Sequence, residues 1–87
     1  MEETLKDKLI RLSEDLAVAV YKLVADFPKY EMYGLSSQLQ RAVISVGANI
    51  VEGNARESEK EMLRFLNIAY ASLAEVKFML RFSKRID

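Results

Sequence analysis

The sequence of 87 residues contains no cysteine, no histidine and no tryptophan, and it has only three glycines and one proline. The lack of cysteine excludes a disulfide framework and a thiolate nucleophile, and the lack of histidine excludes an imidazole base and a histidine-containing metal site. A chain of this length forms one small domain, residues 1–87, with a thin hydrophobic core. We therefore expect a small interaction domain without catalytic, cofactor-binding or metal-binding residues.

Charge is balanced in this chain, with 13 basic and 13 acidic side chains. Zero net charge argues against general binding of polyanions, although a local basic patch stays possible. No uncharged apolar-rich stretch is longer than the one from Ala42 to Val51, which has about half of the roughly 20 residues that span a bilayer. The polar N-terminus does not resemble a signal peptide. We expect a cytoplasmic protein that does not enter a membrane.

Apolar residues recur at spacings of three and four from Leu5 to Phe27, which predicts a first helix over residues 4–26. Pro28 should end this helix, because the residue before a proline is pushed out of the helical region. About half of the chain is apolar (51%), and the rest of it also follows helical spacing. The sequence thus predicts an all-α fold of three long helices.

The second helix is predicted over residues 36–55, with Ser36 or Ser37 as its N-cap and a left-handed ending at residues 53–54. Gly47 within a helix costs about 1 kcal/mol relative to alanine, so we expect a close helix contact there. At 100° per residue the helix carries two apolar stripes about 140° apart. The first stripe is Leu39, Val43, Val46 and Ile50, and the second stripe is Ile44, Ala48, Val51 and Ala55.

The third helix is predicted over residues 58–84, opened by a capping box of Ser58 and Glu61. It is apolar almost all round, and such a helix is normally covered on several sides. Two partner helices cannot cover this much apolar surface in a monomer. We therefore expect an oligomer in which neighbouring subunits supply the cover, although a fourth helix or a loosely packed monomer are alternatives.

Three stretches of the chain carry a pattern that is known from one family. They are residues 27–42, FPKYEMYGLSSQLQRA; residues 45–56, SVGANIVEGNAR, with a serine, then Asn-Ile, Glu-Gly and a trailing arginine; and residues 65–75, with FLNIA, Ser72 and Glu75. This pattern resembles the bacterial four-helix bundle family that is encoded in intervening sequences of 23S rRNA genes. The resemblance covers nearly the whole chain. Related proteins include the accessory variability determinant of diversity-generating retroelements.

The resemblance implies an up-and-down antiparallel bundle that assembles into a ring, typically a homopentamer with a central channel, and no enzymatic activity. Most members have no known biochemical role, and the retroelement relatives bind a reverse transcriptase and nucleic acid through basic surfaces. Members usually continue into a fourth helix, which this chain lacks. Either that helix is absent or the chain is a truncated form.

A polar stripe on the second helix is the first candidate site. Because it lies between two apolar stripes, we expect a hydrogen-bonded seam to a neighbouring helix or subunit rather than a ligand or RNA contact. In this seam Arg41 or Arg56 would pair with Glu52 or Glu75. The candidate seam residues are Arg41, Ser45, Asn49, Glu52, Arg56, Ser72 and Glu75.

The basic end of the third helix, formed by Lys77, Arg81, Lys84 and Arg85, is the second candidate site. Cations at this position suit the helix dipole, but in a ring they would also form a basic rim able to meet RNA phosphates. Four aromatic residues either stack on bases or plug the bundle ends. These are Phe27, Tyr30, Tyr33 and Tyr70. We expect a self-assembling scaffold or adaptor, with a nucleic-acid-binding accessory protein as the alternative.

Overall fold

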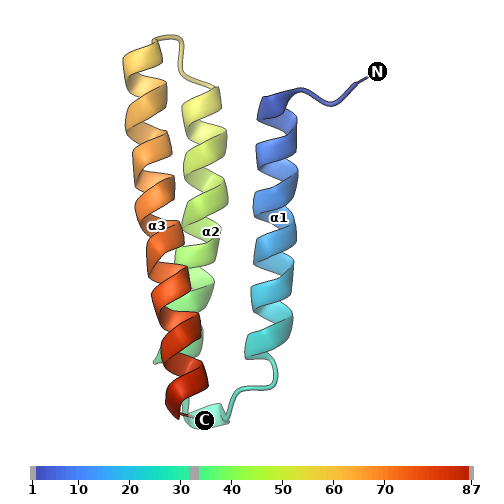
Figure 1. The fold of residues 1–87 in the computed structure, drawn as a ribbon, viewed down its shortest axis with the longest axis vertical. Helices are drawn as coiled ribbons and strands as arrows, with labels where there is room; N and C mark the ends of the chain where they lie inside the picture. Colours follow the sequence, from blue (N-terminus) through green and yellow to red (C-terminus); the bar gives the residue numbers. More distant parts are fainter. Residues whose placement is uncertain (1, 32–33, 87) are drawn as a thin grey trace.

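Three long helices make up the fold. The computed structural model describes residues 2–31 and 34–86, and every regular element within them is helical. The elements are α1 (Leu5–Val24), the short 3-10 helix η1 (Lys29–Glu31), α2 (Leu35–Asn54) and α3 (Glu59–Ile86). The three α-helices run alternately up and down (Figure 1), so the predicted all-α, antiparallel arrangement is confirmed.

Side-chain caps account for the start of two of the helices. The Thr4 Oγ1 accepts a hydrogen bond from the N–H three residues ahead at 3.1 Å, and the Ser58 Oγ accepts an equivalent bond, also at 3.1 Å. α2 begins differently, because Gly34 is its N-cap and supplies no side-chain bond. Ser36 and Ser37 lie inside the first turn, so the predicted serine N-cap is wrong.

The helix ends depart from the predicted bounds by one or two residues. α1 stops early because the N–H groups of Asp26 and Phe27 bond carbonyls three residues back, which tightens the chain before Pro28. α2 ends with Ala55 in a right-handed conformation, φ −87° and ψ −7°. No described residue has a positive φ, so the predicted left-handed ending at residues 53–54 is wrong.

The helix α2 occupies the middle of the fold. α1 and α3 both pack along α2, whereas the backbones of α1 and α3 do not approach each other closely (Figure 1). The first stripe of α2 forms the centre of the core, with Leu39 and Val43 fully buried. The other buried apolar side chains are Val20 and Val24 of α1, Ala42 of α2, and Ala69, Val76 and Met79 of α3. The core is therefore the line where both outer helices meet α2.

Two glycines of α2 mark its closest contacts with the outer helices. A Cβ on Gly47 would lie 3.1 Å from the Ser13 Oγ of α1, so the helix contact predicted at this glycine is present. A Cβ on Gly53 would lie 3.1 Å from the Met62 carbonyl oxygen and 3.1 Å from the Phe65 Cβ. The two sites show that α2 approaches α1 on one side and α3 on the other.

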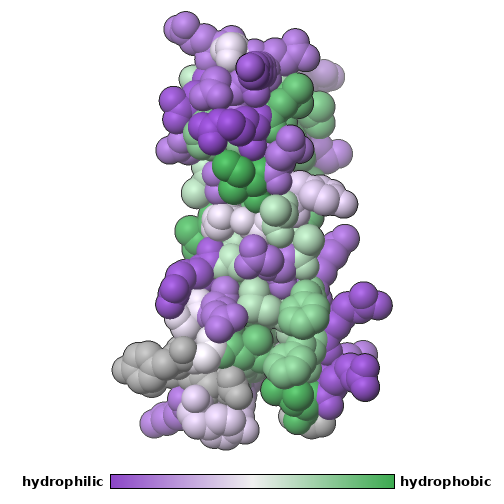
Figure 2. All heavy atoms as spheres, turned by 90° about the vertical axis from the view of Figure 1, so that its left-hand side faces the viewer, coloured by the Kyte–Doolittle hydropathy of each residue, from purple (hydrophilic) through white to green (hydrophobic). Residues whose placement is uncertain are grey.

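Much of the apolar surface stays uncovered in the single chain, whose Cα atoms span 43 × 28 × 18 Å. Seen from the side of α3, polar side chains gather at the end where α3 begins, and apolar ones extend along the lower part (Figure 2). The described chain therefore covers α3 on one face only, and the second stripe of α2 is exposed. Covering these surfaces requires something other than this chain's own three helices.

Candidate functional site

Three of the predicted seam residues, Ser45, Asn49 and Ser72, meet in a narrow contact between α2 and α3. The Oγ atoms of Ser45 and Ser72 are 2.8 Å apart, and Ser72 is buried. The Asn49 Nδ2 donates to the Ser45 carbonyl oxygen at 2.8 Å and to the Ser45 Oγ at 3.1 Å. Because each polar group meets another, the two helices approach closely without leaving a buried hydroxyl unpaired.

The other four predicted seam residues lie on the exposed surface around this contact. The Arg56 Nη2 is 2.8 Å from the Glu52 Oε2, an ion pair along α2 rather than between helices. The Arg41 Nη2 donates to the Ser37 Oγ at 3.2 Å. Within residues 2–31 and 34–86, neither Arg41 nor Glu75 forms an ion pair. The structure thus brings three of the seven residues together between the helices.

An aromatic ring ties the α2–α3 turn together, a feature that the sequence patterns did not reveal. The Arg56 Cζ lies 4.7 Å from the centre of the Phe65 ring, and the Arg64 Cζ lies 4.4 Å from it. Arg56, in the turn that follows α2, also pairs with Glu52, and Arg64 pairs with Glu61 within α3. Phe65 therefore connects the end of α2 to the start of α3 through cation–π contacts.

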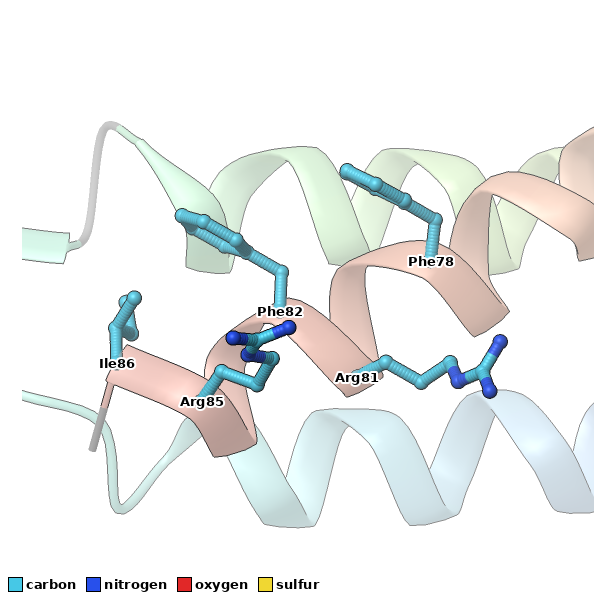
Figure 3. Close-up of a pocket in the computed structure, with 5 residues that line it drawn as sticks. All are labelled: Phe78, Arg81, Phe82, Arg85 and Ile86. Atoms are coloured by element: carbon cyan, nitrogen blue, oxygen red, sulfur yellow. The ribbon is translucent and has the colours of Figure 1, made fainter.

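A hollow on the outer face of α3 joins two of the four predicted basic residues to exposed aromatic rings. It is lined by Phe78, Arg81, Phe82, Arg85 and Ile86. Figure 3 shows both rings leaving α3 on the same side, with the two arginines beside them. The ring centres are 6.3 Å apart and the ring planes differ by 7°. Phe78 and Phe82 are four residues apart in the sequence, and this spacing predicts that the two rings meet on the helix surface.

The two lysines of the basic end lie apart from this hollow. Lys84 lines a different one, between the ends of α1 and α3, together with Phe27 and Leu80. Lys77 is exposed and lines neither hollow. Residues 76–86 contain these four cations and no acidic residue, and none of the four forms an ion pair in the described part of the chain.

The aromatic residues that the sequence suggested for stacking are scattered. Tyr30 and Tyr70 are exposed on separate elements, and Phe27 is half-buried against the core. Tyr33 lies outside the described residues. The three described side chains, Phe27, Tyr30 and Tyr70, therefore lie on separate segments of the chain.

Two apolar surfaces lie on opposite sides of the chain. The first, here called the open face, is assigned from helical periodicity to one side of α1 and of α3, next to the first stripe of α2. The exposed residues assigned to it are Leu5, Leu12 and Leu23, which share one line of α1, and Leu63 and Tyr70, which share one line of α3. The second is the second stripe of α2, in which Ile44 is 50% and Val51 49% exposed. Because the two stripes of α2 point about 140° apart, the two surfaces face nearly opposite directions.

The titratable groups form no centre for metal chemistry in the part of the chain that the structure describes, where no three acidic side chains gather. A hydrogen bond from the Arg11 Nε to the Glu3 Oε1, 2.8 Å long, and the charge of Glu3 raise the pKa of Arg11. This pair anchors the N-terminal segment to α1. None of the described helices is both long and apolar enough to cross a bilayer.

The comparisons with known proteins agree with the three-helix architecture and the motifs on α2 and α3. No curated protein matches the chain. The family described as 23S rRNA-intervening sequence protein matches residues 6–87, which include all three helices, the Ser45–Ser72 contact and the basic end of α3. The chain belongs to the family of 23S rRNA-intervening sequence proteins.

Proposed function

We propose that the chain is a non-enzymatic subunit of a homo-oligomeric scaffold or adaptor in the cytoplasm. The observation that carries this proposal is the pair of apolar surfaces on opposite sides of the molecule. Ile44 and Val51 of the second stripe are about half exposed, and Tyr70 of the open face is 74% exposed. Soluble monomers rarely keep several such patches, so both surfaces are suited to contact other subunits.

The placement of these surfaces favours a closed ring over a dimer. A twofold dimer pairs one surface with itself and leaves the opposite surface in water. If the open face of one subunit meets the second stripe of the next, every subunit covers both surfaces, and a suitable rotation closes the ring. The family resemblance favours five subunits. A ring of this kind presents several copies of every helix surface that does not contact a neighbouring subunit, and a partner can bind these copies together.

The mass of the assembly in solution tests this proposal. Sedimentation equilibrium should give a multiple of the 10.0 kDa chain mass, with five as the expected multiple. Ile44→Glu should dissociate the assembly, because an unpaired charge buried in an interface costs about 3–5 kcal/mol. Leu12→Glu on the open face should have the same effect, since the two surfaces meet each other.

A matched control adds the same carboxylate outside both surfaces. Gln38 is exposed on α2 and lies on neither apolar stripe of that helix, so Gln38→Glu should keep the assembly intact. A wild-type chain that sediments at 10.0 kDa at all concentrations would refute the scaffold. Dissociation by Ile44→Glu but not by Leu12→Glu would refute the pairing of open face with second stripe.

The basic end of α3 favours a second function. In this function the chain is an accessory protein that binds nucleic acid and acts with a reverse transcriptase or another RNA partner. Four cations lie within residues 76–86 without an acidic residue among them. A ring multiplies this charge along one rim, which suits contact with phosphates. Fluorescence anisotropy with a labelled RNA at rising salt tests it. Affinity should fall steeply between about 50 and 200 mM salt through counterion release, and absence of binding at low salt would refute this function.

A further inference from the structure

Phe78 and Phe82 occupy an unusual position for apolar side chains. Phe78 is 68% and Phe82 45% exposed on α3. The two rings lie nearly parallel, with centres 6.3 Å apart, so their flat faces are oriented alike (Figure 3). They add nothing to the core of the single chain. Parallel, exposed rings are suited to stacking with another flat, apolar group.

The charges next to the rings restrict what that group is. Arg81 and Arg85 line the same hollow as the rings, and no acidic side chain lies within ion-pair distance of either in residues 2–31 and 34–86. A guanidinium group binds phosphate through paired N–H donors. The ligand that offers flat rings and phosphates in alternation is a nucleic acid strand.

The order of the rings and arginines along α3 matches the alternation of bases and phosphates in a nucleic acid strand. The order Phe78, Arg81, Phe82, Arg85 places a ring and a cation together in each of two successive helix turns. Four residues advance an α-helix by about 6 Å, so the two ring–cation pairs follow each other along the helix axis. In a duplex the faces of the bases are covered by their neighbours, whereas an unpaired strand exposes them.

We propose that Phe78 and Phe82, with Arg81 and Arg85 beside them, form a stacking platform for single-stranded nucleic acid. The bases stack on the two rings, and the arginines bind the flanking phosphates. This inference rests on the nucleic-acid-binding function proposed above, and it adds which strand form is bound and by which side chains. A second copy of the chain is disfavoured as the occupant, because self-pairing would bring the cations of two chains together. An anionic membrane is disfavoured because the apolar ridge is narrow.

The test measures anisotropy of a labelled, non-self-complementary 20-nucleotide RNA, as a single strand and annealed to its complement. The double variant Phe78→Ala, Phe82→Ala should weaken binding of the single strand at least about tenfold and leave binding of the duplex unchanged. The variant Phe78→Tyr, Phe82→Tyr should bind like the wild type, because it keeps both rings. Tyr30→Ala removes an exposed ring on η1, outside both apolar surfaces, and should have no effect.

Each other result contradicts a defined part of the reasoning. Equal binding of the single strand by the alanine variant overturns the platform but leaves basic-end binding intact. Absence of wild-type binding to either RNA at low salt overturns the nucleic-acid function itself. A change of native mass in the alanine variant assigns the rings to a subunit interface. If the wild type sediments with anionic phosphatidylserine vesicles and the alanine variant does not, while both bind RNA equally, the two rings belong to a membrane surface. A change of native mass or this vesicle result overturns the platform.

Discussion

Replacing Gly53 by alanine should push α2 and α3 apart where they come closest. Gly53 is buried, and a Cβ there would meet the Met62 carbonyl oxygen and the Phe65 Cβ, each at 3.1 Å. Both atoms are fixed to the backbone of α3, so neither can rotate away. The new methyl group must therefore displace a helix rather than a side chain.

The magnitude follows from two opposing effects. Alanine in place of glycine in a helix interior stabilises by up to about 1 kcal/mol. Inserting a methyl group into a well-packed contact costs about 1–3 kcal/mol. The gain is reduced at Gly53, because this residue lies in the last turn of α2. We expect Gly53→Ala to lower the free energy of unfolding by about 1–2 kcal/mol.

Gly47 provides an internal comparison with the opposite outcome. Its added Cβ would lie 3.1 Å from the Ser13 Oγ but 3.6 Å from the Ser13 Cβ. The hydroxyl ends a side chain that can rotate, at the cost of its 2.7 Å hydrogen bond to the Ile10 carbonyl oxygen, and this cost offsets part of the helix gain. Gly47→Ala should therefore be neutral or slightly stabilising. In a background of Ser13→Ala the hydroxyl is gone, so the same change should stabilise by up to about 1 kcal/mol.

Urea unfolding followed by circular dichroism measures these differences. All variants are compared at one protein concentration, because self-association links stability to concentration. Ser13→Ala alone serves as the reference for the double variant. Stability should fall where the added Cβ meets atoms fixed to the backbone, and it should not fall where the Cβ meets a hydroxyl that can rotate. This expectation is refuted if Gly53→Ala is as stable as the wild type, or if both glycine substitutions shift the midpoint equally.

Three further substitutions test the seam, a cap and a surface pair by the same unfolding assay. Ser72→Ala leaves the part-buried Ser45 hydroxyl without its partner across the helices and should destabilise by about 1 kcal/mol, and no loss would show that the contact is dispensable. Thr4→Ala removes the α1 cap and should cost about 1 kcal/mol, whereas Thr4→Ser should restore it. Glu52→Gln weakens only the exposed pair with Arg56 and should change stability by less than about 0.5 kcal/mol; a larger loss would mean that Glu52 is buried in an assembly.

Local features of the chain could be predicted from the sequence because they depend on neighbours within one turn. The apolar spacing of three and four placed all three helices within two residues of their bounds. Ser58 caps α3 as predicted, because a capping bond spans only three residues. The end of α2 was mispredicted, since the Gly53 that suggests a left-handed turn is needed instead for contact with α3.

The candidate seam shows where sequence reasoning stops. Ser45 and Ser72 are 27 residues apart in the sequence, and the polar stripe offered seven residues for one contact. Only the distance between α2 and α3 selects the short hydroxyl pair and leaves the long Arg41 and Glu75 side chains outside. A helical wheel gives the direction of a side chain, but it does not give the separation of two helix axes.

The sequence by itself determined the helices, the family and the excess of apolar surface, because each depends on residue type and spacing along the chain. The tertiary structure decided how that surface is divided. It placed α2 between α1 and α3, so one stripe of α2 became core and the other remained exposed. It also turned Phe78 and Phe82 outward beside two arginines. These outcomes depend on which helices touch, and that is fixed by packing across the whole chain.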